Sequence, residues 1–144
     1  MPKPIQQFVQ FGPVQLPYSQ LFILRRHVFA TVNLKPVAPG HVLVCSRRPV
    51  KRLYDMTEVE TVEFWITVQE VTKVMSDIYK TNCHVSIQDG IHAGQTIPSV
   101  HCHIIPYSGK ILISQAENQK TERSEEDMNQ EAQKLRAHFE QSLL

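Results

Sequence analysis

Short apolar runs alternate with turn residues in the first third of the chain. The run VFATVN at 28–33 and the run HVLVC at 41–45 are separated by Pro36 and the pair Pro39–Gly40, and an earlier run, LFIL, spans 21–24. β-branched stretches of this length between Pro and Gly are typical of β-strands joined by turns. The pattern predicts a strand, a turn and a second strand here. Residues 1–19, rich in Pro and Gln, show no clear period.

A helical period takes over in residues 55–80. Thr57 followed by Glu60 has the spacing of a capping box, in which each side chain bonds the backbone N–H of the other residue. Apolar residues then recur at helical spacing: Trp65, Val68, Val71, Met75 and Ile78. This stripe predicts an amphipathic helix of about six turns that packs against the core.

The period returns to two after residue 82. CHVSIQDG at 83–90 and SVHCHIIP at 99–106 predict two strands, and the segment IHAGQT between them predicts a short loop. Residues 107–123 are polar and predict a surface loop. A second helix is predicted at 124–140, with a Ser124 cap and an apolar row of Met128, Ala132, Leu135 and Phe139.

Strands, helix, strands and helix in this order favour an α+β fold. We expect an antiparallel sheet of about five strands with two main helices packed on it. The length of 144 residues predicts one domain spanning 1–144.

Composition and charge exclude several classes of protein. Fifteen Lys and Arg against 14 Asp and Glu leave a net charge of +1, so the chain lacks the basic footprint of a duplex nucleic-acid binder. No apolar run is long enough for a membrane span, and the N-terminus lacks the apolar run of a signal peptide. The three cysteines, Cys45, Cys83 and Cys102, are an odd, dispersed set that favours reduced thiols. We expect a cytoplasmic protein, with the nucleus as an alternative.

Two histidines on the predicted strand 99–106 are the main candidates for chemistry. Ser99, His101 and His103 share one face, because successive side chains of a strand point to opposite sides. Cys102 points the other way and is interpreted as a packed thiol. From the spacing alone the histidines are incidental surface residues, half of a metal site, or catalytic imidazoles. A metal site would need further ligands, and no CxxC or HExxH spacing supplies them, although His41, His84 and Cys83 are available.

The segment just upstream favours the catalytic interpretation. Gln88, Asp89, Gly90, Gly94 and Gln95 all lie within fourteen residues of His101. Glutamine amides and the backbone N–H groups of glycines are neutral donors that stabilise anionic oxygens in a preorganised site.

These motifs resemble the histidine-triad superfamily. QDG, AGQT and a hydrophobically spaced His-x-His that ends at a proline are similar to its signature, and NLKPVAPGHVLV resembles its other half. Together with the C-terminal RSEED segment they most resemble the fragile-histidine-triad branch. The resemblance covers roughly residues 8–140. It implies a hydrolase of dinucleoside polyphosphates such as diadenosine triphosphate, a homodimer whose sheet extends across both chains, and the helix with Trp65, Val68 and Val71 as a candidate interface.

The resemblance also implies site residues. His101 matches the nucleophile and His103 the last histidine of the triad, while Ser99 stands where the family has its first histidine. The main-chain carbonyl of Ser99 would still hold the second ring nitrogen of His101. The substrate-binding positions are matched by Phe11, Leu16 and Leu43 against the base, Thr31 in the same pocket, Asn33 on the ribose, His41 beside the triad, and Gln88 and Gln95 on the phosphates. The remaining histidines, His27, His84, His92 and His138, match no site position and are interpreted as structural or solvent-facing.

Several alternatives stay open at this stage. The leading expectation is diadenosine triphosphate cleavage to AMP and ADP through a nucleotidyl-histidine intermediate. The alternatives are a nucleoside phosphoramidate hydrolase, a slow or inactive nucleotide-binding signalling module, and a zinc-binding module. No resident metal or tightly bound cofactor is expected, and Mg²⁺ or Mn²⁺ would arrive with the polyphosphate.

Overall fold

The computed structural model describes residues 6–107, 122–140 and 142–144. Its strands are β1 Phe8–Phe11, β2 Val14–Pro17, β3 Leu21–Leu24, β4 Val28–Val32, β5 Val42–Ser46, β6 Cys83–Ile87 and β7 His101–Pro106. Its α-helices are α1 Glu58–Tyr79 and α3 Glu125–Arg136, and its 3-10 helices are η1 Tyr18–Gln20, η2 Leu53–Asp55 and η3 Ile91–Ala93. No helix in these described ranges is long and apolar enough to cross a membrane.

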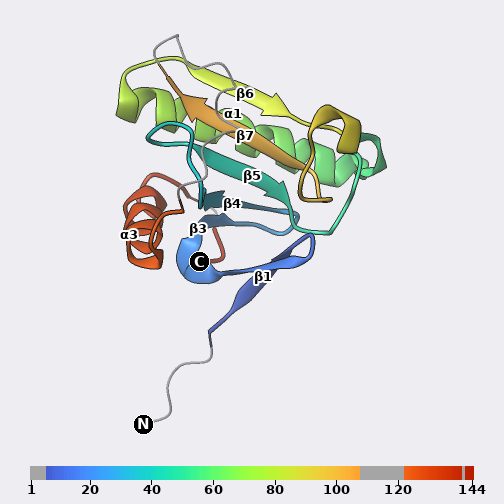
Figure 1. The fold of residues 1–144 in the computed structure, drawn as a ribbon, viewed down its shortest axis with the longest axis horizontal. Coiled ribbons are helices and arrows are strands. Elements are labelled where there is room, and N and C mark those ends of the chain that lie inside the picture. The colour runs from blue at the N-terminus through green and yellow to red at the C-terminus, as the bar shows by residue number, and fades with distance from the viewer. Residues whose placement is uncertain (1–5, 108–121, 141) are drawn as a thin grey trace.

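The strands form an antiparallel five-stranded sheet in the order β3-β4-β5-β7-β6 and a separate hairpin of β1 and β2 (Figure 1). This agrees with the α+β prediction of about five strands and two main helices. The helix α1 runs along the sheet on one side, and α3 packs against β3, β4 and η1 (Figure 1). The hairpin covers the other face, where its Val9 and Phe11 join Leu21, Phe29 and Leu43 in a second apolar cluster.

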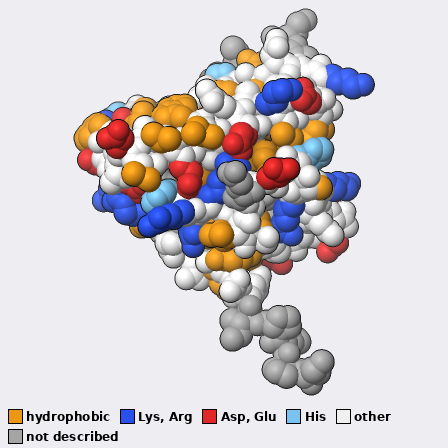
Figure 2. Space-filling view, turned by 180° about the vertical axis from the view of Figure 1, so that it is seen from behind, with side chains coloured by type: hydrophobic (Ala, Val, Ile, Leu, Met, Phe, Trp, Pro, Cys, Tyr) orange, Lys and Arg blue, Asp and Glu red, His pale blue; other side chains and the backbone are white. Residues whose placement is uncertain are grey.

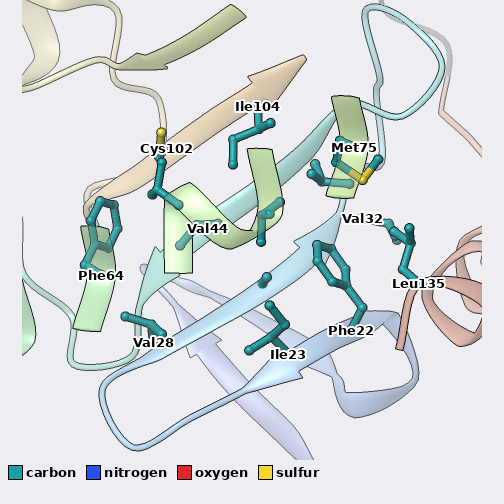
Figure 3. Close-up of a cluster of buried hydrophobic side chains, with 14 of the residues drawn as sticks. Phe22, Ile23, Val28, Val32, Val44, Phe64, Met75, Cys102, Ile104 and Leu135 are labelled. Carbon is teal, nitrogen blue, oxygen red and sulfur yellow. The ribbon is translucent and has the colours of Figure 1, made fainter. Parts of the chain in front are cut away.

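The larger core lies between the sheet and the two helices (Figure 3). Val44 of β5 and both Cys102 and Ile104 of β7 point toward Phe64 and Met75 of α1, and none of these side chains is exposed. Cys102 is therefore a packed thiol, as predicted, and burial raises its pKa to about 12.

The helix α1 begins where the capping box predicts. The Thr57 hydroxyl accepts from the backbone N–H of Glu60, and the Glu60 carboxylate accepts from the N–H of Thr57. Arg48 donates two hydrogen bonds to the same carboxylate, whose pKa falls to about 2 because the guanidinium stabilises its charged form. The helix ends at Tyr79, and its C-cap residue Lys80 has a positive φ of 51°.

The predicted apolar stripe of α1 divides into two parts. Val68, Val71 and Met75 are buried in the core, whereas Trp65 and Ile78 are 39% and 40% exposed. The core interpretation is correct for the first three and wrong for the last two. Val68 and Val71 are also unavailable for the interface suggested from the sequence. Seen from behind, hydrophobic side chains gather over the upper part of the molecule, where α1 lies (Figure 2).

One element was not predicted, and two predicted boundaries are wrong. The hairpin β1–β2 was missed, because residues 1–19 show no clear period. The last strand begins at His101 and not at Ser99. The N–H of Ser99 bonds the carbonyl of Ile97 at 2.8 Å, so it does not pair with a neighbouring strand. The C-terminal helix ends at Arg136 and not at residue 140. Most of the predicted polar loop 107–123 lies outside the described residues.

Candidate active site

The sheet face under the hairpin carries a row of imidazoles. His101 and His103 alternate along the inner strand β7, and their partners on β5 are Cys45 and Leu43. His41 stands immediately before β5 on the same face. The three rings form a continuous group, with centroids 5.1 Å apart for His101 and His103 and 5.2 Å apart for His41 and His103.

One hydrogen bond defines the protonation of His101. Its Nδ1 lies 2.7 Å from the carbonyl oxygen of Ser99, which can only accept, so Nδ1 carries the proton and donates it. The remaining nitrogen, Nε2, then holds a free lone pair. This is the main-chain contact expected for position 99. The Ser99 hydroxyl is fully buried and has no hydrogen-bond partner among the described residues, so the side chain contributes no polar contact there.

The tautomers of His41 and His103 follow from a chain of contacts. The N–H of Val37 donates to Nδ1 of His41 at 3.2 Å, so Nε2 of His41 carries the proton and donates to Nδ1 of His103 at 3.0 Å. Neutral His103 then carries its own proton on Nε2. That nitrogen is buried without a partner in the described part of the chain. It is a donor available to a ligand.

Burial keeps all three rings neutral at pH 7. It lowers the pKa of His41 to about 3, with further lowering from His103 and the Arg123 guanidinium. It lowers the pKa of His103 to about 4, and the neighbouring His101 and His84 lower it further. The pKa of His101 is also lowered by burial, and its bond to the Ser99 carbonyl opposes the shift. A neutral imidazole with a free Nε2 lone pair is a competent nucleophile.

Asn33 lies at the end of β4, beside His41. The backbone N–H of Lys35 donates to its Oδ1 at 3.1 Å, which turns the amide nitrogen toward the His41 ring, 3.1 Å from Nε2 and 3.4 Å from Nδ1. The Asn33 carbonyl accepts two hydrogen bonds from Arg123, at 2.7 and 3.1 Å. Asn33 is therefore fixed through both its side chain and its backbone.

The expected base-binding residues surround the other side of His101. The Phe11 ring of the hairpin meets the His101 ring edge-on at a centroid distance of 5.0 Å. Phe11 and Leu43 are buried in the second apolar cluster, and Leu16 packs against it. Thr31 is buried on the same face, and its hydroxyl donates to the backbone carbonyl of Gln20 at 3.1 Å. These four residues do come together in the structure.

The expected phosphate donors need a partial correction. The register of β6 on β7 pairs Ser86 with His103 and ends with Ile87 opposite Cys102. Gln88 follows directly, so strand alternation predicts that it continues the face of Ser86 and His103. The Gln95 side chain, however, is turned into its own loop, where Oε1 accepts from the N–H of Gly90 at 3.0 Å and Nε2 donates to the Lys51 carbonyl at 3.2 Å. The N–H of Gly94 bonds the Ile91 carbonyl. The glycine N–H groups are therefore engaged within the loop and do not face a ligand.

Two residues at the site were not predicted. Arg123 lies 90 positions from Asn33 in the chain, so no local pattern links the two. His84 was interpreted as structural or solvent-facing, but it pairs with Ile105 and shares the face of Ser86 and His103, and its Nε2 is buried without a partner in the described ranges. The alternation CHVSIQ holds the signal for His84, because positions 84, 86 and 88 follow one face of the strand.

Together these features define an antiparallel α+β protein with a row of buried, neutral imidazoles along an inner strand of its sheet. Residues 16–110 match the HIT domain model, and the chain belongs to that family. It is 38% identical over 139 residues to a bis(5'-adenosyl)-triphosphatase of Dictyostelium discoideum, covering 92% of this chain and 93% of that one.

Two further relatives support the same assignment. A bifunctional bis(5'-adenosyl)-triphosphatase/adenylylsulfatase of Arabidopsis thaliana is 42% identical over 100 residues, which are 69% of this chain and 56% of the relative. The solved structure of the Plasmodium falciparum diadenosine triphosphate hydrolase in complex with cyclomarin A superposes with a TM-score of 0.81 at 27% identity, covering 94% of this chain and 86% of that one. The match therefore spans nearly the whole of two relatives and about half of the third.

Proposed function

We infer that this chain hydrolyses dinucleoside polyphosphates, with diadenosine triphosphate cleaved to AMP and ADP. The observation that carries the proposal is the 2.7 Å contact between His101 Nδ1 and the Ser99 carbonyl, which leaves Nε2 free to attack phosphorus. The similarity to the triphosphatases of Dictyostelium and Arabidopsis supports this choice of substrate.

The reaction proceeds in two steps. His101 Nε2 forms a bond to the α-phosphorus, and the bond from that phosphorus to the bridging oxygen breaks, so ADP leaves with the electron pair. Water then attacks the nucleotidyl-histidine, the P–N bond breaks, and AMP and one proton are released. ADP is a weakly basic leaving group, so the first step needs little proton donation.

His103 stabilises the charge that develops on the phosphoryl oxygens. Its Nε2–H is buried and unpaired among the described residues, so it can donate to an oxygen of the α-phosphate without first breaking another bond. Removing one such donor commonly costs about 10²–10³ in rate. His41 fixes the tautomer that puts this proton on Nε2.

The remaining residues bind the substrate. Phe11, Leu16, Leu43 and Thr31 hold the base, and Asn33 bonds the ribose. Gln88, which follows β6, contacts the phosphates, and Gln95 acts through the loop that its side chain closes. Mg²⁺ or Mn²⁺ arrives with the polyphosphate, which has the oxygen ligands that these cations prefer. The three free cysteines favour a cytoplasmic or nuclear protein.

We also propose a homodimer that joins through the β6 edge. β6 pairs only with β7 in the described sheet. Val85 of this edge strand is 39% exposed. The Cys83 thiol of β6 lies 3.9 Å from the Thr72 carbonyl of α1. Trp65 precedes Thr72 by seven residues, or about two helical turns, so it lies on the same side of α1, toward β6. The exposed Trp65 and Val85 therefore support a second sheet pairing at β6.

Turnover assays on three substrates test the function. We expect release of AMP and ADP from diadenosine triphosphate, measured by chromatography of the products. Faster turnover of an adenosine phosphoramidate would favour the phosphoramidate hydrolase, and adenosine phosphosulfate tests the second activity named for the Arabidopsis relative.

Tight AMP binding with turnover below about 10⁻³ s⁻¹, against a typical enzyme median near 10 s⁻¹, would favour a binding module. Zinc in elemental analysis of the purified protein would favour the zinc module.

A further inference from the structure

The loop between β6 and β7 is tied to the segment before α1 through the side chain of Asp89. The carboxylate accepts from the backbone N–H of Leu53 at 2.8 Å and from the Arg52 guanidinium at 3.2 and 3.3 Å. Arg52 and Leu53 form the start of η2, so one carboxylate joins two segments 36 or more residues apart in the chain.

A second tie holds the far end of the same loop. Gln95 donates to the Lys51 carbonyl at 3.2 Å and accepts from the N–H of Gly90 at 3.0 Å. The backbone closes the loop as well, since the N–H of Gln95 bonds the Gly90 carbonyl at 3.1 Å. Residues 51–53 thus contact the loop near its beginning and at its end. The loop, with η3 in it, projects from the sheet at the end where α1 begins (Figure 1).

The position of Asp89 in the chain links this contact to the reaction. It directly follows Gln88, the first residue after β6, which by strand alternation continues the face of Ser86 and His103. The backbone turns sharply at the next residue, since Gly90 has a φ of +106°, and a Cβ there would lie 3.4 Å from Cζ of Arg52. The orientation of the Gln88 side chain therefore depends on how the Asp89 carboxylate is held.

This ion pair contributes little to the stability of the fold. The side chains of Arg52 and Asp89 are 41% and 32% exposed, and pairs in such surroundings contribute little to the free energy of unfolding. A displacement of about 1 Å in a residue that contacts the substrate, by contrast, can cost about 10² in rate. Loss of the contact should therefore affect the reaction much more than the stability.

We propose that Asp89 is a positioning residue, which holds Gln88 and the loop 88–95 against the phosphates through Arg52 and the N–H of Leu53. The inference rests on the proposed function, in which Gln88 contacts the phosphates. The Asp89 carboxylate bonds Arg52 and Leu53 and takes no part in bond making.

Kinetics of Asp89 and Arg52 variants test this role. Asp89→Ala should lower kcat for diadenosine triphosphate about 10- to 100-fold, and Asp89→Asn should lower it less, because its Oδ1 still accepts from Leu53. Arg52→Ala should lower kcat less than Asp89→Ala, because the Asp89 carboxylate still accepts from the N–H of Leu53. Asp89→Ala combined with Arg52→Ala should be no slower than Asp89→Ala alone, because that variant has already lost the contact with Arg52. Arg52→Lys should recover part of the loss. The control is Asp77→Ala, which removes an exposed ion pair with Lys73 on α1 and should leave kcat unchanged.

Hydrogen exchange separates positioning from general destabilisation. In Asp89→Ala the amides of Ala93, Gly94 and Gln95 should exchange faster, while those of β7 keep the protection of the parent protein. A kcat within twofold of the parent, or unchanged exchange in the loop, would overturn the proposal. Equal loss of protection in β7 would also overturn it, because the effect would then be on the fold. A parent protein without turnover would contradict the proposed function, and the loop exchange would still show whether Asp89 holds the loop.

Discussion

His101 is held by a main-chain atom, and this has consequences for the residue at position 99. The Ser99 carbonyl accepts the Nδ1 proton at 2.7 Å, whereas the Ser99 hydroxyl bonds nothing in the described part of the chain. Any residue that keeps the backbone in place can supply that carbonyl. The family's first histidine is therefore replaceable in this chain without loss of the orienting contact.

Substitution of Ser99 tests this reasoning. Ser99→Ala removes no hydrogen bond seen in the described residues. We therefore expect kcat/KM for diadenosine triphosphate to stay within about tenfold of the parent value, which is the most that the loss of one modest hydrogen bond would cost. Ser99→His should also stay within about tenfold in either direction. A rise of a hundredfold or more in Ser99→His would show that the parent site is impaired by its serine.

The neutral state of His101 predicts the pH dependence of the reaction. Burial lowers the pKa of His101 from its ordinary value of 6.5, so Nε2, the atom that we propose attacks phosphorus, is unprotonated at pH 7 and gains a proton only as the pH falls below 6.5. We expect kcat/KM to be flat from pH 7 to 8 and to decline only below pH 6.5. A decline that begins above pH 6.5 would contradict a buried neutral nucleophile.

The residue scale also shows the limits of sequence reasoning about the site. The resemblance placed the Ser99 carbonyl against His101 Nδ1, and the structure has that contact. Strand alternation places His101 and His103 on one face, whereas Ser99 precedes the strand and contributes only its main-chain carbonyl. It did not show that the Gln95 amide turns into its own loop, since side-chain orientation in a loop depends on contacts 44 residues away. The contact of Arg123 with Asn33 could not be predicted for the same reason, because the two residues lie 90 positions apart in the chain.

At the scale of elements, the helical period predicted α1, and the apolar runs between turn residues predicted β4 and β5, in which every residue is buried. The helix α1 and the strands β4, β5 and β6 lie close to the predicted positions, because their apolar residues pack into one core. The hairpin β1–β2 was missed because each strand has four residues and only Val9 and Phe11 of them are buried. The turn Gly12–Pro13 between FVQF and VQLP is the signal that could have revealed it.

The capping box of α1 gives a prediction for stability. Thr57→Ala removes the acceptor for the N–H of Glu60 and should lower the free energy of unfolding by about 1 kcal/mol, within a range of about 0.5–2 kcal/mol, measured by chemical denaturation. The control is Thr72→Ala in the middle of the helix, where the hydroxyl bonds the Val68 carbonyl and alanine has the higher helix propensity. An equal loss in the two variants would contradict a specific contribution from the cap.

At the scale of the whole molecule, the exposed edge of the sheet predicts the assembly. Light scattering at micromolar concentration should give twice 16.6 kDa for the parent protein. Trp65→Arg and Val85→Arg should shift the mass toward 16.6 kDa, because each places a charge where we propose that the second chain packs. Val59→Arg is the control, since Val59 is 62% exposed at the start of α1. A parent mass of 16.6 kDa would rule the dimer out.

Mapping of the nucleotidyl group tests the central claim most directly, because it identifies the atom that attacks phosphorus. The protein is mixed with diadenosine triphosphate, quenched with denaturant within a turnover, digested, and examined by peptide mass spectrometry, with His101→Asn as the matched variant. We expect one adenylyl group on the peptide that contains His101, with fragmentation placing it on that ring, and none in His101→Asn, which should still bind AMP. An adenylyl group on His103, or turnover by His101→Asn within tenfold of the parent, would contradict nucleophilic catalysis by His101.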